Sequence, residues 1–376
     1  MDLDLTDEQQ MLQEMVRSLC AGACSLTTVR ELEDDPVGFA PDFWKQLGAL
    51  DLTGLLVPEE HGGSGMTLLE AAVVYEELGR ALAPSPHFVS AVLAAGALLR
   101  AGAEEQRAAW LPRIASGESI VSVAWNEPGN GFGPAGVQLT ARADGDDVVL
   151  DGVKWHVPFA SAADALLVVA RTAPDDGDGS GIDLFLVERD AAGLALEQQF
   201  TIASDTQYAA TFDGVRVPAS ARVGGAGTGW ATWADVLLDG QILLAAQAVG
   251  GASHALDITV QYAKDREQFD KPLGAFQAIS HYLADASTAV DGARILAYEA
   301  AWARSQDRPV DQLAPMAKLV ACQTFRDVTA MGEQVFGGVG FTLEYDIQLY
   351  FRRAKQLQLS WGDDRTLEEQ VAATVL

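Results

Sequence analysis

Apolar residues recur at helical spacing through the first third of the chain. The first helix is predicted to begin after Thr6, because Gln9 follows it at the spacing of a capping box. A later helix is predicted over Ala91–Ala101, where alanine and leucine predominate. We therefore expect residues 1–118 to form an N-terminal helical domain. The apolar face of its first helix consists of Met11, Leu12, Met15, Val16 and Leu19.

The pattern changes from helical spacing to short β-type runs between residues 119 and 225. These runs are rich in β-branched residues, and the turn Asp144-Gly145 separates two of them as in a hairpin. We expect a middle β-domain, barrel-like in form, over residues 119–225. The expected strands are Ser119–Trp125, Val137–Ala143, Val148–Val153, Ala165–Ala170, Asp183–Val187 and Ala209–Val217.

Helical spacing returns at Gly229 and continues to the end of the chain. Long helices are predicted near 230–264, 275–306 and 309–336. Long helices joined by short connections are typical of an antiparallel bundle. We expect residues 226–376 to form a C-terminal four-helix bundle, so that the whole chain is mainly α with a central β-domain.

Composition narrows the classes of function. The chain has 376 residues, of which 49% are hydrophobic, and a formal net charge of −28 at pH 7. This charge argues against nucleic acid and anionic membrane surfaces as partners, because both are polyanions. The sequence has no apolar signal core or membrane-spanning run, and Cys20, Cys24 and Cys322 fit no zinc spacing. We expect a reduced, cytoplasmic protein without a metal site.

The segment Gln261–Asp285 joins two of the long helices and carries candidate chemistry. Within it, Arg266, Gln268, Phe269 and Gln277 combine hydrogen-bond donors with one aromatic ring. A guanidinium together with fixed donors suits a diphosphate. The alternative is a helix–helix corner with a solvated charge cluster, because charge runs usually lie on solvated faces.

A second segment, Gly332–Lys355, contains glycines that let a backbone come close to a ligand. The two segments, in this order and at this spacing, resemble the acyl-CoA dehydrogenase family. The first is similar to the family signature Arg-x-x-Phe-x-x-x-(Leu/Ile)-x-x-(Phe/His)-Gln. The second is similar to Gln-x-x-Gly-Gly-x-Gly-(Phe/Tyr), with Gln334, Gly337 and Gly338 at its glutamine and first two glycines.

Three further motifs extend the resemblance over nearly the whole chain. The loop Leu55–Gly65 is similar to a Pro-Glu-x-x-Gly-Gly-x-Gly loop of the family. Asn126–Gly129, directly after Trp125, is similar to its Thr-Glu-Pro-Gly strand end. Trp155 and Val157 lie in a stretch similar to Lys-x-Trp-Ile-(Ser/Thr), whose tryptophan packs on the flavin ring in the family.

The resemblance implies an activity, a cofactor and partners. Members of the family use FAD to oxidise an acyl-CoA thioester to the trans-2-enoyl-CoA, and a carboxylate of the protein removes the α-proton. The arm around Arg266 reaches FAD held mainly by a neighbouring subunit, and electron-transferring flavoprotein is the implied electron acceptor. The residues implied to bind FAD are Arg266, Gln268, Phe269, Gln277, Gln334, Gly337, Gly338, Trp125, Asn126, Trp155 and Val157.

Both positions at which the family places its catalytic glutamate lack one here. They fall on Trp361 and Gly240. The remaining candidates for the base are Asp363 and Asp239, which lie close by in the sequence. Val157 also stands where a serine or threonine of the family faces the flavin.

These departures leave three hypotheses open. The first is a base-lacking, FAD-sharing subunit of a heterotetramer with two copies each of two chains, similar to steroid side-chain acyl-CoA dehydrogenases. It is favoured because the residues lent to a partner are complete. The second is an active homotetramer, or a related flavin oxidase, that uses Asp363 or Asp239 as its base, since the family's nitroalkane oxidases use an aspartate. The third is a flavin-free scaffold. The sequence leaves the acyl group and the electron acceptor open.

Overall fold

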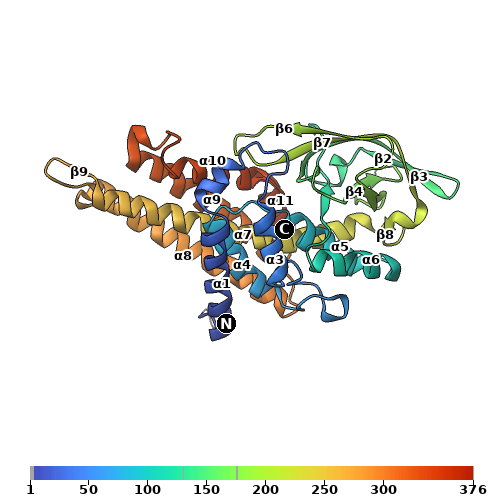
Figure 1. The fold of residues 1–376 in the computed structure, drawn as a ribbon, viewed down its shortest axis with the longest axis horizontal. Coiled ribbons are helices and arrows are strands. Elements are labelled where there is room, and N and C mark those ends of the chain that lie inside the picture. The colour runs from blue at the N-terminus through green and yellow to red at the C-terminus, as the bar shows by residue number, and fades with distance from the viewer. Residues whose placement is uncertain (1–3, 130, 175–176, 376) are drawn as a thin grey trace. The chain divides into compact units, whose positions relative to one another are not determined.

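A computed structural model describes residues 4–129, 131–174 and 177–375 (Figure 1). The chain divides into two compact units, each built from separate stretches of sequence. Unit 1 comprises Met1–Arg30, Thr67–Ala83 and Gln241–Leu376, and unit 2 comprises Glu31–Met66 and Pro84–Gly240. The predicted domains 1–118, 119–225 and 226–376 are consecutive stretches of sequence, whereas these units are defined by contacts. The predicted boundaries therefore stay a prediction.

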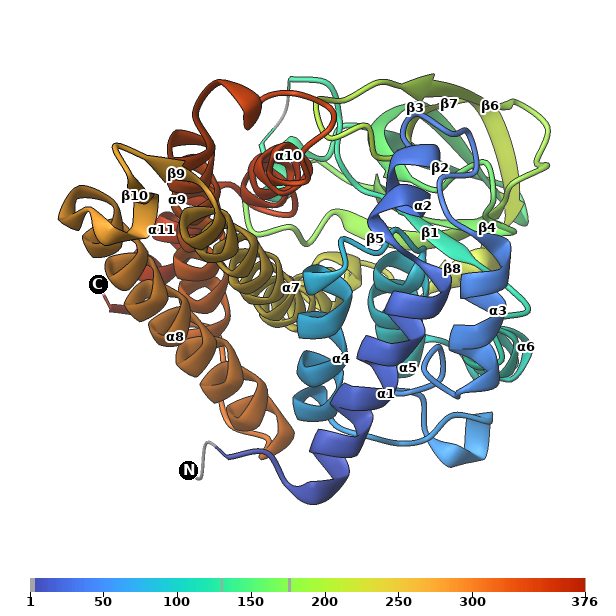
Figure 2. The same cartoon turned by 60° about the vertical axis from the view of Figure 1, so that its left-hand side comes forward.

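Unit 1 is a bundle of helices. Figure 2 shows α7 and α8 lying side by side, with the short β9–β10 hairpin at their tip. α9 packs against α8, α10 and α11, and α4 packs between α1 and α8. The helices are α1 (Asp7–Ala23), α2 (Leu26–Glu31), α4 (Leu68–Arg80), α7 (Gly229–Asp265), α8 (Gln277–Ser305), α9 (Leu313–Phe336), α10 (Ile347–Leu359) and α11 (Asp364–Val375), and α7 begins in unit 2.

The long helices predicted from apolar spacing are confirmed. The capping box that begins α1 is also present, because the Gln9 N–H donates to Thr6 Oγ1 at 3.2 Å and the Thr6 N–H donates to Gln9 Oε1 at 3.1 Å. α7 is long and apolar enough to cross a membrane, but 78% of its most apolar window is buried inside the protein, as in a core helix.

Two glycines let α4 and α7 touch backbone to backbone. A Cβ atom added at Gly250 would lie 1.8 Å from the carbonyl oxygen of Glu76, and one added at Gly79 would lie 1.9 Å from that of Gln247. No side chain separates the helices at these two points. The next residue of α4, Glu77, is 2% exposed and accepts two hydrogen bonds from the Arg17 guanidinium, at 2.6 and 2.9 Å.

Unit 2 contains the sheet and shorter helices. Within the described residues eight strands form one sheet in the order β6-β7-β3-β2-β4-β5-β8, with β1 pairing to β4. β6 and β8 end this order without pairing to each other, so the sheet is open and the expected barrel does not close. The strands are β1 (Val121–Ala124), β2 (Thr140–Asp144), β3 (Asp147–Pro158), β4 (Ala165–Arg171), β5 (Ile182–Glu188), β6 (Leu194–Gln199), β7 (Gln207–Pro218) and β8 (Arg222–Val223).

The helices of unit 2 are α3 (Pro41–Ala49), α5 (Ala95–Ala101) and α6 (Glu104–Ala115). A π-helical segment, Phe88–Ala94, leads directly into α5. The predicted helix over Ala91–Ala101 therefore begins three residues earlier, with wider turns at its start. π-helical turns of this kind are frequent at functional sites.

A buried ion pair ties three segments of unit 2 together. Lys154 on β3 is 0% exposed, and its Nζ donates to Glu127 Oε1 at 2.6 Å and to the Trp125 carbonyl oxygen at 2.9 Å. The same Glu127 oxygen accepts from the N–H groups of Gln138 and Leu139, both at 2.9 Å. Burial lowers the pKa of Lys154 to about 8, although Glu127 acts to raise it.

We expect Gly79→Ala to lower the free energy of unfolding by about 1–3 kcal/mol, because the new methyl group must push α4 and α7 apart. The matched control is Gly292→Ala on the exposed face of α8, where an added Cβ meets nothing within 4 Å. That change should stabilise by up to about 1 kcal/mol through helix propensity. Denaturant unfolding measures both. Equal shifts for the two variants would refute the close approach of the helices.

The buried pair also gives the stability of unit 2 a defined pH dependence. Lys154 has a folded pKa of about 8, whereas an unfolded lysine titrates near 10.4. The unfolded chain therefore holds more protons between these values, and the contribution of this group to the unfolding free energy rises with pH across that interval.

We compare the wild type with the double variant Lys154→Met, Glu127→Gln, which leaves no lone buried carboxylate. The difference in unfolding free energy should shift in favour of the wild type between pH 8 and about 10.4 and stay level between about pH 6 and 7. Denaturant titrations across this range measure it. A level difference up to pH 10 would mean that Lys154 keeps its ordinary pKa.

Candidate functional site

The predicted diphosphate segment begins where α7 ends. The Arg266 N–H donates to the Tyr262 carbonyl oxygen, and the Leu273 N–H donates to the Arg266 carbonyl oxygen, both at 2.9 Å. The backbone of Arg266 is therefore held on both sides of the hairpin. Its side chain is exposed, and among the described residues its guanidinium forms no ion pair. The solvated charge cluster considered as the alternative is thus not tied together by salt bridges of Arg266.

The hairpin after Arg266 presents an aromatic ring to solvent. Its strands, β9 (Glu267–Gln268) and β10 (Lys271–Pro272), are joined by Phe269 and Asp270, which have φ values of 54° and 64°. A bulky residue in this left-handed region costs about 1–2 kcal/mol. Phe269 is nevertheless 86% exposed. Its ring makes an edge-on contact with the Phe276 ring, at 6.1 Å between centroids, and leaves most of its surface open to solvent.

The second signature lies at the end of α9, next to this arm. The Tyr262 ring on α7 stacks on the Phe336 ring, the last residue of α9, at 4.1 Å between centroids. Gln334 and the first residue of α8, Gln277, are both exposed. The structure therefore brings the two sequence motifs together at one end of unit 1 (Figure 2).

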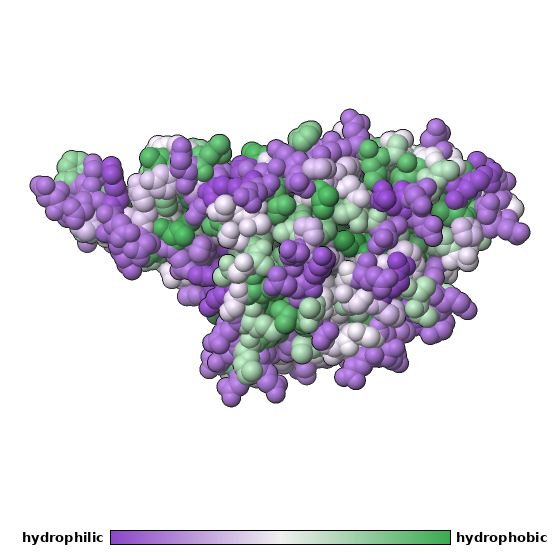
Figure 3. Space-filling view, viewed as in Figure 1, coloured by the Kyte–Doolittle hydropathy of each residue, from purple (hydrophilic) through white to green (hydrophobic). Residues whose placement is uncertain are grey.

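The glycines of the second signature leave open space in front of the backbone. Gly337 ends α9 with φ 67°, and a Cβ atom added at Gly337 or Gly338 would meet nothing within 4 Å. The loop that follows is apolar and exposed: Phe341 is 67% and Leu343 is 73% accessible to solvent. Figure 3 shows hydrophobic side chains gathered on this part of the surface. Patches of this kind mark binding surfaces.

The predicted flavin-ring residues lie in unit 2, around a β-bulge. The Trp155 N–H donates to the Asn126 carbonyl oxygen at 2.8 Å, so the two motifs are in contact. The register of β3 against β7 shifts between Lys154 and Val157, which is the bulge. Bulges re-aim side chains next to active sites. Here Trp155 is 39% exposed and Val157 is fully buried.

His156 is a residue of the bulge that the sequence motifs did not single out. It has φ 54°, its side chain is exposed, and its Nδ1 lies 2.7 Å from Gln207 Oε1. Counted from Lys154, the tryptophan of the Lys-x-Trp pattern falls on His156 and its hydroxyl residue falls on Pro158. Trp155 and Val157 therefore stand one residue earlier than the pattern requires, which is a further departure of this chain from the family.

Trp125 is placed differently from Trp155. It is 3% exposed, and its ring packs against Trp233 at 5.1 Å and Phe132 at 5.6 Å between centroids. Its indole is a core residue of unit 2. What the Trp125–Asn126 segment offers at the surface is mainly its backbone and the half-buried Asn126 side chain.

Asp363, the first candidate for the base, caps a helix. Its Oδ1 accepts from the N–H of Thr366 at 3.0 Å and from the Thr366 hydroxyl at 2.7 Å, at the start of α11. Burial acts to raise the pKa of Asp363, but these hydrogen bonds outweigh it and the pKa is lowered. A carboxylate held in this way is a weaker base, and its cap has to break before it accepts a proton.

The second base position is closed by packing. Asp239 forms an ion pair with Arg100, with 2.6 Å between Oδ2 and Nη2. A Cβ atom added at Gly240 would lie 3.0 Å from Leu93 Cδ2 and 3.1 Å from Phe88 Cζ, both in the π-helical segment. A glutamate does not fit at Gly240 unless these side chains move. The other family position, Trp361, is 8% exposed.

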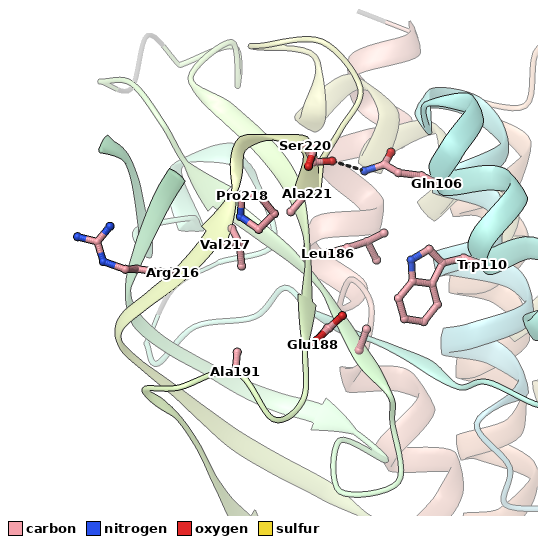
Figure 4. A pocket seen from close by; sticks show the side chains of 11 residues that line it. Gln106, Trp110, Leu186, Glu188, Ala191, Arg216, Val217, Pro218, Ser220 and Ala221 are labelled. Carbon is pink, nitrogen blue, oxygen red and sulfur yellow. Dashed lines mark hydrogen bonds between the residues drawn. The ribbon is translucent and has the colours of Figure 1, made fainter. Parts of the chain in front are cut away.

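A separate hollow of about 360 Å³ lies in unit 2. It is found near the end of β7, whereas Val157 pairs with Tyr208 near the start of that strand. In Figure 4 the Trp110 indole faces the hollow and Arg216 points away from it. None of the described residues predicted to bind FAD or to act as the base lines it. The lining residues are Gln106, Trp110, Ala165, Leu186, Glu188, Ala191, Arg216, Val217, Pro218, Ser220 and Ala221.

Comparison with known proteins gives full-length matches. Profiles of the acyl-CoA dehydrogenase N-terminal, middle and C-terminal domains match residues 6–118, 122–215 and 227–376. The chain is 32% identical over 381 residues to the probable acyl-CoA dehydrogenase YngJ of Bacillus subtilis, with 100% of both proteins covered.

Solved structures agree with the sequence matches. Butyryl-CoA dehydrogenase from Megasphaera elsdenii superposes with a TM-score of 0.93 at 29% identity, covering 100% of both chains. A chain of the ChsE4-ChsE5 complex from Mycobacterium tuberculosis superposes with a TM-score of 0.90 at 30% identity, covering 100% of this chain and 99% of that one. The chain therefore belongs to the acyl-CoA dehydrogenase family, whose members are FAD-dependent oxidoreductases that act on a CH–CH bond.

Proposed function

We propose that this chain is the base-lacking, FAD-sharing subunit of a heteromeric acyl-CoA dehydrogenase. One contrast carries the proposal. Arg266 is exposed and forms no ion pair among the described residues, whereas the candidate carboxylates Asp363 and Asp239 are already engaged by Thr366 and Arg100. The guanidinium of Arg266 is therefore available to a ligand, whereas the carboxylates of Asp363 and Asp239 are not available as bases.

The residues of unit 1 fit the diphosphate end of FAD. A guanidinium presents a fork of donors that matches phosphate oxygens and cannot be titrated away. The open backbone at Gly337 and Gly338 lets a nucleotide approach without meeting a side chain. We assign Gln268, Phe269, Gln277 and Gln334 to the same arm, in each case toward FAD held mainly by a neighbouring subunit.

The residues of unit 2 are assigned to the flavin ring of the chain's own site. FAD, when bound, supplies the group that accepts the hydride. The ring of Trp155, in the β-bulge, is available to the flavin. The carbonyl oxygen of Asn126 accepts a hydrogen bond from the Trp155 N–H and so restrains the bulge. With Val157 buried and no free carboxylate at either base position, this site would bind without abstracting the α-proton, so the partner subunit must supply the base.

The similarity to a chain of the ChsE4-ChsE5 complex supports a partner that is a different acyl-CoA dehydrogenase chain. A steroid or another bulky acyl-CoA is the substrate class we favour, with electron-transferring flavoprotein as the acceptor and the cytoplasm as the location. The alternatives are an active homotetramer or related oxidase that uses Asp363 or Asp239, and a flavin-free scaffold. The engaged state of both aspartates weighs against the former.

The assembly is tested by expressing the chain alone and together with a neighbouring acyl-CoA dehydrogenase gene product. We expect little flavin absorbance per protomer alone, and flavin with turnover after co-expression. Asp363→Asn and Asp239→Asn should leave the turnover of the assembled enzyme nearly unchanged. Full flavin and turnover from the chain alone would establish the homotetramer instead. No flavin under either condition would establish the scaffold.

We expect Arg266→Ala to weaken FAD binding by the assembled oligomer roughly ten- to a hundredfold, because a charge-assisted hydrogen bond contributes on the order of 1.5–3 kcal/mol. Arg266→Lys keeps the charge without the fork and should fall between the wild type and Arg266→Ala. Flavin occupancy after gel filtration at sub-micromolar protein measures it.

The matched control is Arg365→Ala, which also removes one exposed positive charge from unit 1 but only breaks a surface pair with Glu369. It should leave occupancy unchanged. Full occupancy in Arg266→Ala would reduce Arg266 to a helix-corner residue. Loss of FAD together with dissociation of the oligomer would show that the cofactor stabilises the subunit interface by mass action.

A further inference from the structure

A fully buried lysine lies behind the turn that carries Trp361 and Asp363. Lys318, in the second turn of α9, is 0% exposed. Its Nζ donates to the carbonyl oxygens of Gly362 at 2.7 Å and Leu357 at 3.3 Å. A buried ammonium is unfavourable unless it is hydrogen-bonded, so these two acceptors fix where the side chain ends.

The two acceptors belong to one turn and not to a counter-ion. Among the described residues Lys318 forms no ion pair. Burial lowers the pKa of Lys318, and its neighbours Cys322, Asp364 and Asp363 act to raise it. The lysine is therefore bound chiefly by backbone carbonyl oxygens. Hydrogen bonds are directional, so these two bonds restrict the conformation of the turn.

The geometry of the turn explains why it needs such a tie. Leu357 lies in the last turn of α10, whose final carbonyls have no N–H partner within the helix. Trp361 and Gly362 follow with φ values of 59° and 99°, two left-handed residues in succession. A tryptophan in that region costs about 1–2 kcal/mol. It persists only where the surroundings determine the conformation, and Lys318 binds on both sides of it.

We propose that Lys318 is a positioning residue that sets the conformation of residues 360–363. Through residues 360–363, Lys318 also sets which groups this chain presents to its flavin. This second statement rests on the function proposed above. The lysine itself touches neither substrate nor cofactor, because its Nζ is enclosed by Gly362 and Leu357.

The test uses Lys318→Met, which keeps the apolar stem and removes the ammonium. Hydrogen exchange, followed by mass spectrometry in the assembled oligomer, should speed up at least about tenfold in peptides over residues 357–366, because two hydrogen bonds to a charged donor are lost. Lys318→Arg retains charge and donors and should restore much of the protection.

The matched control is Thr329→Val, a buried polar residue of the same helix whose hydroxyl bonds only within α9, to the carbonyl oxygens of Phe325 and Arg326. It should not change exchange over residues 357–366. If Lys318→Met does not fold, Lys318→Gln, which keeps an amide donor, replaces it. Exchange over residues 357–366 should then speed up by a smaller factor.

A spectroscopic readout separates positioning from general stability. With 5-fluorotryptophan in place of the 8 tryptophans, the resonance that Trp361→Phe removes should shift in Lys318→Met and not in Thr329→Val. The visible circular dichroism of bound FAD, compared at equal occupancy, should change in the same variant only.

Exchange that rises equally throughout α9 in Lys318→Met and Thr329→Val, with an unmoved Trp361 resonance, would overturn the proposal. The function proposed above fails in a different way, by the absence of flavin from every wild-type assembly. In that case the exchange and resonance results still decide whether Lys318 holds the turn.

Discussion

Buried ammonium groups satisfied by backbone carbonyl oxygens hold the candidate site in shape. Lys154 in unit 2 and Lys318 in unit 1 are both fully buried, and each donates to a carbonyl of a segment that the family motifs place near the flavin. An ammonium left without acceptors in the interior would cost several kcal/mol. Each lysine therefore needs the carbonyl oxygens of its loop as acceptors, and its hydrogen bonds in turn stabilise the conformation of that loop.

The two ties differ in their partners. Lys154 also has a carboxylate, Glu127, whose Oε1 accepts from the Lys154 ammonium and from the N–H groups of Gln138 and Leu139. Among the residues that the structure describes, Lys318 has only carbonyl oxygens as direct partners. The first arrangement joins the segment after β1, the segment before β2 and the middle of β3 around one oxygen atom. The second restrains a single left-handed turn.

Much of the fold was readable from sequence because its signals are local or periodic. The Thr6–Gln9 capping box and the long helices α7, α8 and α9 depend on spacings of a few residues, and they were predicted correctly. β6 was missed because Leu-Ala-Leu-Glu-Gln-Gln at the edge of the sheet has no β-branched residue. The π-helical segment Phe88–Ala94 was not recognised because all but its first residue are buried, which leaves no periodicity to read.

The site was readable only in part. The segments around Arg266 and Gly337 each match a family signature in the sequence, and the structure brings them together through the stacked rings of Tyr262 and Phe336. The ties made by Lys154 and Lys318 span 27 and 44 residues of sequence, and polar contacts at such separations follow no periodic rule. Asp363 caps Thr366, three residues on, and in the sequence an aspartate at a helix start fits a cap as well as it fits a catalytic base.

The exposed apolar side chains of unit 1 have a consequence for the life of the protein in a cell. Phe269, Phe341 and Leu343 are each largely covered by water in the single chain. Surfaces of this kind attract chaperones, proteases and other copies of the same protein. If a partner subunit covers them, a chain made in excess of its partner is removed faster than an assembled one. Degradation of the surplus would then keep the two subunits at matched amounts, and a pulse-chase measurement of half-life with and without the partner would show it.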